Sequence, residues 1–314
     1  CGEIPLPAYG ACDLGSLNLV RFIEQPFSSA ARISFDSLTD AAQQAVRFLD
    51  NVIDVSRFPL SQQQEQALQT RRIGLGISWL AVTQFLLGFR YGSAESLDIA
   101  ARVMRTICHA AYRASIRLAK EKGTFPAFDS DSYLQARFIR SLPADIREGI
   151  ATTGMRNSHL IAIAPTGTIS LLANNVSSGI EPVFEARYRR RMRQPGGEVE
   201  EYEVMDYACQ LWNNSNGEGD LPPAFIDARA LSPLSHLQMQ AAVQPYVDNA
   251  ISKTINVPAD YDFADYKSLF EQAYELGLKG CTGFRPNPVT GSVLSTGADN
   301  SRGPHCCDID READ

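Results

Sequence analysis

The chain opens with Cys1-Gly2-Glu3-Ile4-Pro5-Leu6-Pro7 and continues after Ala8 with Tyr9-Gly10-Ala11-Cys12-Asp13-Leu14-Gly15-Ser16-Leu17-Asn18-Leu19. Prolines and glycines recur through both stretches, so one helix cannot run through them, and an extended loop or short strand with a tight turn is expected. Residues i and i+2 of an extended segment point the same way. Cys1 and Glu3 are therefore predicted to face one cavity, and a loop that turns back brings Cys12 close to them.

Composition and charge restrict the class of protein. The chain has 314 residues with 44% hydrophobic and 21% charged residues, as in soluble globular proteins of one large or two ordinary domains. A net charge of −7 and a pI near 5.2 argue against nucleic acid or an anionic membrane as the main partner. There is no run of eighteen apolar residues and no visible signal peptide.

The cysteines indicate a reducing compartment. Seven cysteines are an odd number, scattered along the chain without the density of a disulfide scaffold, so a cytoplasmic location is expected. Their spacing to one another and to the four histidines matches no zinc site, and no metal is expected. Cys108 and His109 are predicted to fill a helix rather than form a site, because adjacent helical residues point about 100° apart.

Hydrophobic periodicity predicts a helix-rich α/β protein. In the predicted helix 35–56 the apolar stripe is Leu38, Ala41, Ala45, Phe48, Leu49 and Ile53. Gly74 and Gly76 precede an apolar run that is interpreted as a helix, with close packing or an anion cradle as alternatives. The other expected helices are 61–68, 93–122, 131–150 with a break near Pro143, 202–212, 232–246 and 262–278, and the expected strands are 160–164, 254–257 and 279–287.

A second informative block is Leu160-Ile161-Ala162-Ile163-Ala164-Pro165-Thr166-Gly167-Thr168-Ile169-Ser170. A short apolar run bounded by turn residues predicts a buried strand, and the residues after the turn begin a helix. A strand, a glycine turn and a helix N-terminus together bind anions through backbone N–H groups and nearby hydroxyls. An ordinary turn with capping hydroxyls is the alternative interpretation.

The opening stretches resemble the active-site loop of ribonucleotide reductases of the adenosylcobalamin-dependent class II branch, through Cys-Gly-Glu and Cys-Asp-Leu-Gly-Ser-Leu-Asn-Leu at the family's spacing. The resemblance implies that Cys1 is the thiyl-radical cysteine that removes the ribose 3′ hydrogen. It further implies that Glu3 takes the 3′-hydroxyl proton and that Cys12 is one half of the reducing dithiol. It also implies adenosylcobalamin as cofactor.

Further blocks extend the resemblance over nearly the whole chain. In this family the loop Pro165-Thr166-Gly167-Thr168, with Ser170, binds the substrate's phosphates. Segments 174–184 and 248–258 also resemble the family, and Gly283-Phe284 stand where other reductases place two tyrosines, which favours the cobalamin-dependent branch. The implied fold is the C-terminal part of a ten-stranded α/β barrel built from two five-stranded halves, spanning residues 1–288.

The resemblance also predicts what the chain works with. The family's Asn-Pro before the radical cysteine is absent, so a fragment, a processed chain or one piece of a split enzyme is expected, inactive without the missing N-terminal half. Residues 289–314 are expected to form a flexible tail, in which Cys306 and Cys307 are either a redox shuttle for a thioredoxin-like reductant or an incidental pair. A ribonucleotide substrate and a homo-oligomer are also implied.

Two functions compete for the same first residue. N-terminal-nucleophile amidohydrolases use a first-residue cysteine as nucleophile and its α-amine as base, and Cys1 would serve. Those enzymes need long antiparallel strands, whereas this chain is predicted to be helix-rich with short strands.

Two further features have predicted roles outside this comparison. His159 is expected to be a structural hydrogen-bonding residue. The basic segment 187–193 is expected to be either a solvated hairpin or a contact for a phosphate or the missing half.

Overall fold

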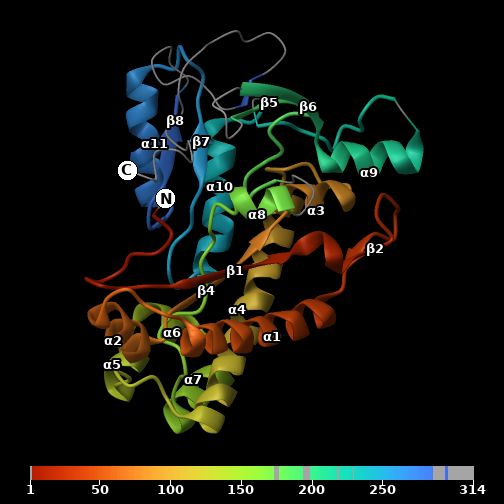
Figure 1. Ribbon diagram of the computed structural model, residues 1–314. Helices are drawn as coiled ribbons and strands as arrows, with labels where there is room; N and C mark the ends of the chain where they lie inside the picture. The colour runs from red at the N-terminus through yellow and green to blue at the C-terminus, as the bar shows by residue number, and fades with distance from the viewer. Residues whose placement is uncertain are drawn as a thin grey trace.

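Helices outweigh strands in the structure, a computed structural model that describes residues 2–172, 177–193, 199–217, 219–228, 230–285 and 294–295. It is a mixed α/β fold in which short parallel strands lie among long helices (Figure 1). The helix-rich α/β class predicted from the sequence is confirmed.

Strands β1 (Asp13–Asn18) and β4 (Ile73–Ser78) form the first parallel pair, with Asp13 opposite Ile73 and Asn18 opposite Ser78. All six residues of β4 are buried. Parallel strands with both faces covered carry no charged face, and β4 accordingly alternates large apolar residues with small ones. The sequence did not predict this strand, whereas the apolar helix expected after Gly74 and Gly76 is present as α3 (Leu80–Leu86).

Three more segments continue the parallel order. Leu75 of β4 bridges Ile161, and Ile163 bridges Ile251. The segment containing Ile251 continues into β7 (Thr254–Asn256), which pairs with β8 (Thr282–Phe284). The order is thus β1, β4, the segment around 161–163, the segment 249–256 and β8. Within the described residues these five segments do not close into a barrel.

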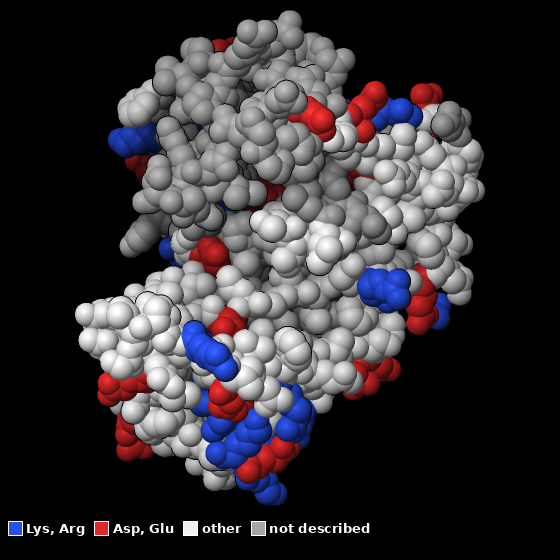
Figure 2. Space-filling view, in the orientation of Figure 1, with Lys and Arg blue, Asp and Glu red and all other residues white. Residues whose placement is uncertain are grey.

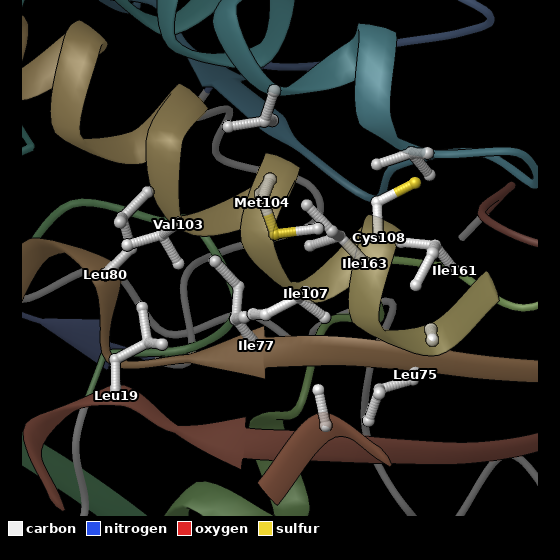
Figure 3. Close-up of a cluster of buried hydrophobic side chains, with 14 of the residues drawn as sticks. Leu19, Leu75, Ile77, Leu80, Val103, Met104, Ile107, Cys108, Ile161 and Ile163 are labelled. Atoms are coloured by element: carbon white, nitrogen blue, oxygen red, sulfur yellow. The ribbon is translucent and has the colours of Figure 1, made fainter. Parts of the chain in front are cut away.

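Two long helices cover one face of these strands. They are α1 (Phe35–Val55) and α4 (Ala94–Lys122), and the Ser93 side chain caps α4 by accepting a hydrogen bond from the backbone N–H of Ser96. Gly123 ends α4 with φ of 85°, a conformation that glycine adopts without strain. Figure 3 shows the core between α4 and β4, where Met104, Ile107 and Ile77 pack together.

The buried face of α1 differs from the predicted stripe. Its buried apolar residues are Leu38, Ala42, Val46, Leu49 and Ile53, whereas Phe48 is 68% exposed. The prediction of Ala41 and Ala45 as core residues was also displaced by one position. Asp50 lies on the buried face as well, because Arg71 and Arg156 donate hydrogen bonds to its carboxylate at 2.9 and 3.2 Å.

The remaining elements surround this core. The short strands β2 (Ile23–Glu24) and β3 (Arg32–Ile33) pair with each other. The other helices are η1 (Leu19–Phe22), α2 (Ser61–Thr70), α3 (Leu80–Leu86), α5 (Ser130–Gln135), α6 (Arg137–Ser141), α7 (Ala144–Thr153), α8 (Gly167–Leu172), α9 (Tyr207–Asn216), α10 (Pro233–Val243), η2 (Gln244–Tyr246) and α11 (Phe263–Glu275).

A hairpin of one basic and one acidic strand lies at the end of the molecule away from α7 (Figure 1). Strand β5 (Arg187–Arg193) runs antiparallel to β6 (Val199–Met205) and also pairs with β9 (Leu294–Ser295). The hairpin was one of the two interpretations of this segment. The predicted helix 202–212 is corrected, since 202–205 belong to β6 and the helix begins at Tyr207, with Asp206 as its cap.

Charged side chains of both signs lie together on the surface. In Figure 2 basic and acidic groups alternate at the end of the molecule where α7 lies in Figure 1. Ion pairs such as Arg113 with Asp145, and Arg47 with Glu121, account for such mixing. No helix in the described part of the chain is long and apolar enough to span a membrane.

Candidate active site

The opening loop lies across the exposed ends of the central segments. The backbone carbonyl of Glu3 accepts a hydrogen bond from the Ala250 N–H at 2.8 Å, and the Arg72 Nη1 donates to the carbonyl of Pro5 at 3.1 Å. The loop therefore bridges the segment 249–256 and the start of β4. Cys1, the predicted radical cysteine, lies outside the described residues.

Cys12 stands immediately before β1. A Cβ built on Gly74 would lie 3.4 Å from the Cys12 sulfur, so this thiol and the Gly74 position share one face of the strand pair. Burial raises the pKa of Cys12 to about 12, the Arg72 guanidinium opposes that rise, and the charges of Asp13, Asp248 and Glu3 add to it. Cys12 is therefore a protonated thiol at neutral pH, and Glu3 lies within electrostatic reach of it.

The loop after residue 164 has its own internal bonds. Thr166 has φ of 58°, and its hydroxyl accepts a hydrogen bond from the Gly179 N–H at 2.8 Å. The Ser170 hydroxyl donates to the Gly167 carbonyl at 2.6 Å. Both hydroxyls are thus used within the chain and buried, while Gly167 and Thr168 are exposed at the start of α8.

The strand segment before this loop and the opening loop both hydrogen-bond to Ala250. The Ile163 N–H donates to the carbonyl of Ala250 at 3.2 Å, and the Ala250 N–H donates to Glu3. Ile163 lies two residues before Pro165. The structure therefore places Glu3, Cys12 and the Pro165–Ser170 loop on neighbouring segments, whereas Cys306 and Cys307 lie outside the described residues.

Asp248 organises the backbone between these parts, and sequence reasoning did not find it. Its carboxylate accepts hydrogen bonds from the Tyr112 hydroxyl at 2.7 Å and from the backbone N–H groups of Leu160 and Ile161 at 2.8 Å each. The Lys279 ammonium donates to the carbonyls of residues 247, 248 and 249. The adjacent polar pair at 248–249, just before an apolar strand, was the available signal.

A buried ion pair anchors the segment that follows the loop. Lys253 is 1% exposed, and its ammonium donates to Glu181 Oε2 at 2.5 Å and lies 2.8 Å from Nδ1 of His236. Glu181 Oε1 also accepts from the Thr254 N–H at 2.7 Å. Burial and the Lys253 charge lower the pKa of His236 to about 3, so its imidazole is neutral. A lysine placed between the apolar residues Ile251 and Ile255, directly before β7, was the signal in the sequence.

Other candidate residues have structural roles. Cys108 and Cys209 are buried, and Cys108 lies inside α4. The His159 Nδ1 lies 3.2 Å from the Ser158 hydroxyl, and His109 packs edge-on against Tyr246. The part of the chain that the structure describes holds no group of three or more His, Cys, Asp or Glu side chains able to bind a metal ion.

Comparison with known proteins decides the family. The model of the ribonucleotide reductase barrel domain matches residues 1–284. The chain belongs to the ribonucleotide reductase family. The resemblance inferred from the two cysteine blocks is thereby confirmed.

Individual relatives agree with this assignment. The chain is 39% identical over 317 aligned residues to a vitamin B12-dependent ribonucleoside-diphosphate reductase of Mycobacterium tuberculosis, covering 95% of this chain and 42% of that protein. It is 34% identical to a protein of the same name from Thermoplasma acidophilum, covering 97% and 39%. A ribonucleoside-diphosphate reductase large subunit of Monkeypox virus is 26% identical, covering 91% and 40%. The reductase chain thus spans about two fifths of these relatives.

Proposed function

We propose that this chain is part of an adenosylcobalamin-dependent reductase that converts ribonucleotides to 2′-deoxyribonucleotides. The observation that carries the proposal is that Glu3 and Ile163, two residues before the 165–170 loop, both hydrogen-bond to Ala250, with Cys12 nearby, in a chain that is 39% identical to a B12-dependent ribonucleoside-diphosphate reductase. This supports ribonucleoside diphosphates as the substrate class.

Each residue receives the role that its chemistry suits. Cys1 removes the ribose 3′ hydrogen as a thiyl radical, and Glu3 accepts the proton of the 3′-hydroxyl. Replacing the 2′-hydroxyl by hydrogen is a two-electron reduction, so Cys12 and a second cysteine give up two hydrogens and form a disulfide while the hydroxyl leaves as water. The burial that raises the pKa of Cys12 suits a group that donates hydrogen rather than one that is permanently a thiolate.

The substrate's phosphates are assigned to the loop Pro165–Thr168 and to the start of α8. The N–H groups of Gly167 and Thr168 begin a helix and so lack intrahelical acceptors. Both residues are exposed, and a Cβ on Gly167 would meet no atom within 4 Å. Thr166 and Ser170 then shape the loop from within, through the hydrogen bonds to Gly179 and Gly167.

The described residues do not fit an axial ligand for cobalt. The ring nitrogen Nδ1 of His236 faces the Lys253 ammonium in the core, His159 lies beside Ser158, and His109 packs on an aromatic ring. Adenosylcobalamin is proposed as the cofactor because two relatives are named vitamin B12-dependent reductases, and no described residue of this chain is assigned to it.

The rest of the reductase completes the fold in this proposal. The five parallel segments represent one half of the ten-stranded barrel and residues 1–288 form that portion. Residues 289–314 form a tail, of which Leu294–Ser295 pair with β5. The outer edges of β1 and β8 are unpaired within the described residues, and such edges need covering. The remainder of a longer reductase is the proposed partner, with a thioredoxin-like reductant acting through Cys306 and Cys307 and with assembly as a homo-oligomer.

The amidohydrolase alternative is not retained. The strands beside the opening loop are parallel and short, whereas that chemistry was expected on long antiparallel strands. The family match covers the whole opening loop.

A reconstitution experiment tests the proposal. The chain is assayed alone and with the N-terminal portion of a B12-dependent relative, using ribonucleoside diphosphate, adenosylcobalamin and dithiothreitol, and deoxyribonucleotide is measured by chromatography. Product is expected from the combination and not from the chain alone. Cys1→Ser should abolish it, and the matched variant Cys281→Ser should retain it. Product from Cys1→Ser, or from the chain alone, contradicts the proposal.

The phosphate assignment has a separate binding test. Gly167→Asp introduces a negative charge without a steric clash, so it should weaken nucleoside diphosphate binding by at least about tenfold, equivalent to about 1.4 kcal/mol. Gly219→Asp places the same charge where a Cβ also meets nothing and serves as the control. Equal affinities of the two variants, measured by calorimetry on the reconstituted protein, contradict the assignment.

A further inference from the structure

Cys12 has a cationic neighbour that neither the family match nor the motif assigns to the chemistry. In the register of β1 and β4, Asp13 lies opposite Ile73, and continuing it by one residue sets Cys12 opposite Arg72. Directly opposite residues of paired parallel strands project to the same face of the sheet. The position of the Cys12 sulfur beside Gly74, two residues after Arg72, gives the same face independently.

The adjacent residues Arg71 and Arg72 have different bonding partners. Arg71 is buried in an ion pair with Asp50 and Asp54, on the side of α1. The Arg72 Nη1 instead donates to two neutral oxygens, the Pro5 carbonyl and the Asn249 Oδ1, at 3.1 Å each. Among the ion pairs of the described residues none involves Arg72, so its positive charge is not neutralised by a direct carboxylate contact.

The charges around Cys12 have opposite effects. Burial raises the pKa of this thiol most, and Asp13, Asp248 and Glu3 raise it further. Among the groups that act on Cys12, Arg72 is the one that lowers the pKa of its thiol. The interaction is mutual: burial lowers the pKa of Arg72, while Cys12 and Asp248 oppose that decrease. Two independent features, register and electrostatics, thus join the same two side chains.

We propose that Arg72 is a positioning residue that stabilises the thiolate form of Cys12 during thiol–disulfide exchange. This role rests on the proposed function, in which the Cys12 disulfide must be reduced after each turnover. A thiolate of the dithiol reductant attacks one sulfur, the S–S bond breaks, and its electron pair leaves with the other sulfur. When Cys12 is the leaving sulfur it departs as a thiolate in a site that disfavours negative charge, and it then takes up a proton from solvent. Lowering the basicity of the leaving thiolate speeds such exchange.

The two hydrogen bonds of Arg72 explain how the charge is held in place. The acceptor at Pro5 belongs to the loop that carries Glu3, and the acceptor at Asn249 belongs to the strand segment beside it. A guanidinium presents several donors in a fixed plane, so it holds both acceptors and still directs charge at the sulfur. Lysine at this position keeps the charge but provides a single donor atom on a flexible stem.

The test measures thiol reactivity, which needs neither substrate nor cofactor. The reduced full chain is treated with iodoacetamide across pH 7 to 10, and labelling of each cysteine is quantified by peptide mass spectrometry. Half-buried Cys281 serves as an internal reference, and buried Cys108 reports unfolding if it becomes labelled. Arg113→Gln removes a positive charge from a surface ion pair and is the matched control for Arg72→Gln.

Arg72→Gln should slow labelling of Cys12 about tenfold at pH 8.5 relative to Cys281, which corresponds to a pKa rise of about one unit. Arg113→Gln should leave it unchanged, and Arg72→Lys should stay within about threefold of the original chain. A Cys12 rate in folded Arg72→Gln within twofold of the original chain overturns the proposal. If Arg72→Gln exposes Cys108 and is therefore unfolded, Arg72→Lys decides the question instead. A tenfold loss of the Cys12 labelling rate in folded Arg72→Lys also overturns the proposal. Either result leaves the reductase assignment standing, because the reconstitution assay decides that separately.

Discussion

Replacing Gly76 by alanine tests how closely β4 approaches its neighbour. The added Cβ would lie 2.2 Å from the carbonyl oxygen of Ala162, far inside the 3.4–4 Å of ordinary van der Waals contact. The obstructing atom belongs to the backbone and cannot rotate away. The strand must therefore shift, which strains the hydrogen bonds that join Leu75 to Leu160 at 2.7 Å and Ala162 to Leu75 at 3.1 Å.

The expected loss of stability follows from these contacts. Overpacking costs about 1–3 kcal/mol, and each weakened backbone hydrogen bond adds about 1 kcal/mol. Gly76→Ala should therefore lower the free energy of unfolding by about 3–5 kcal/mol. With a urea dependence of about 3 kcal/mol per molar, the midpoint falls by at least about 1 M. Trp79 is buried immediately after β4, so its fluorescence reports the transition, with circular dichroism as a second probe.

Two other glycines provide graded comparisons. A Cβ on Gly74 would meet Leu14 at 2.6 Å, but that contact is the end of a flexible side chain that is 44% exposed, so Gly74→Ala should cost less. A Cβ on Gly280 would meet nothing within 4 Å, and Gly280→Ala should be nearly neutral. If Gly76→Ala proves no more destabilising than Gly280→Ala, the close approach of these strands is refuted.

Three further perturbations have defined outcomes. Burial raises the pKa of Asp206 to about 7, above its value in the unfolded chain, so native protein binds the extra proton and stability falls as pH rises from about 4 to 7. Asp206→Asn keeps an acceptor for the Ala208 N–H and should be more stable than the original chain at pH 8 but not at pH 4; equal pH profiles in urea titrations would count against this. Lys253→Met leaves a partly buried Glu181 carboxylate unpaired and should destabilise by about 3 kcal/mol, with the double variant Lys253→Met, Glu181→Gln recovering part of the loss; additive losses would argue against coupling. Tyr112→Phe removes one donor from the Asp248 carboxylate and should cost about 1–3 kcal/mol in the same assay, whereas an unchanged midpoint would show that this bond is dispensable.

Local signals were sufficient for much of the fold. Ser93 and Gly123 mark the ends of α4, because capping and a positive φ depend on residues adjacent in sequence. The apolar run before Pro165 was correctly predicted to be a buried strand segment, because the turn residues that bound it are also adjacent in sequence. The alternation in β7, where Ile255 is buried between half-buried Thr254 and Asn256, was also visible.

Other features depend on partners that are distant in sequence. Gly74 and Gly76 lie within β4, a strand that the sequence did not predict because its pairing with β1 and with Ile161 joins residues that are distant in sequence. Phe48 was assigned to the core by periodicity, yet the buried face of α1 is rotated towards Val46 and Asp50 because Arg71 and Arg156 bond to that carboxylate.

The candidate site shows the same division. The proximity of Glu3 and Cys12 was predicted from an extended loop that turns back, and the loop after residue 164 from its residue pattern. Arg72 was not predicted as a site residue, because its relation to Cys12 depends on the register between β1 and β4. The role of Asp248 required knowing that its carboxylate replaces backbone acceptors for Leu160 and Ile161.

The order of the parallel segments also affects how the chain acquires its structure. β1 pairs with a strand sixty positions later, Leu75 with Ile161, and Ile163 with Ile251, so each ladder encloses a long intervening stretch. Contacts of such separation form slowly, since long loops must close before any pairing stabilises them. During synthesis β1 therefore waits until β4 has been made, about sixty residues later, and its open backbone is available to chaperones or to mispairing meanwhile.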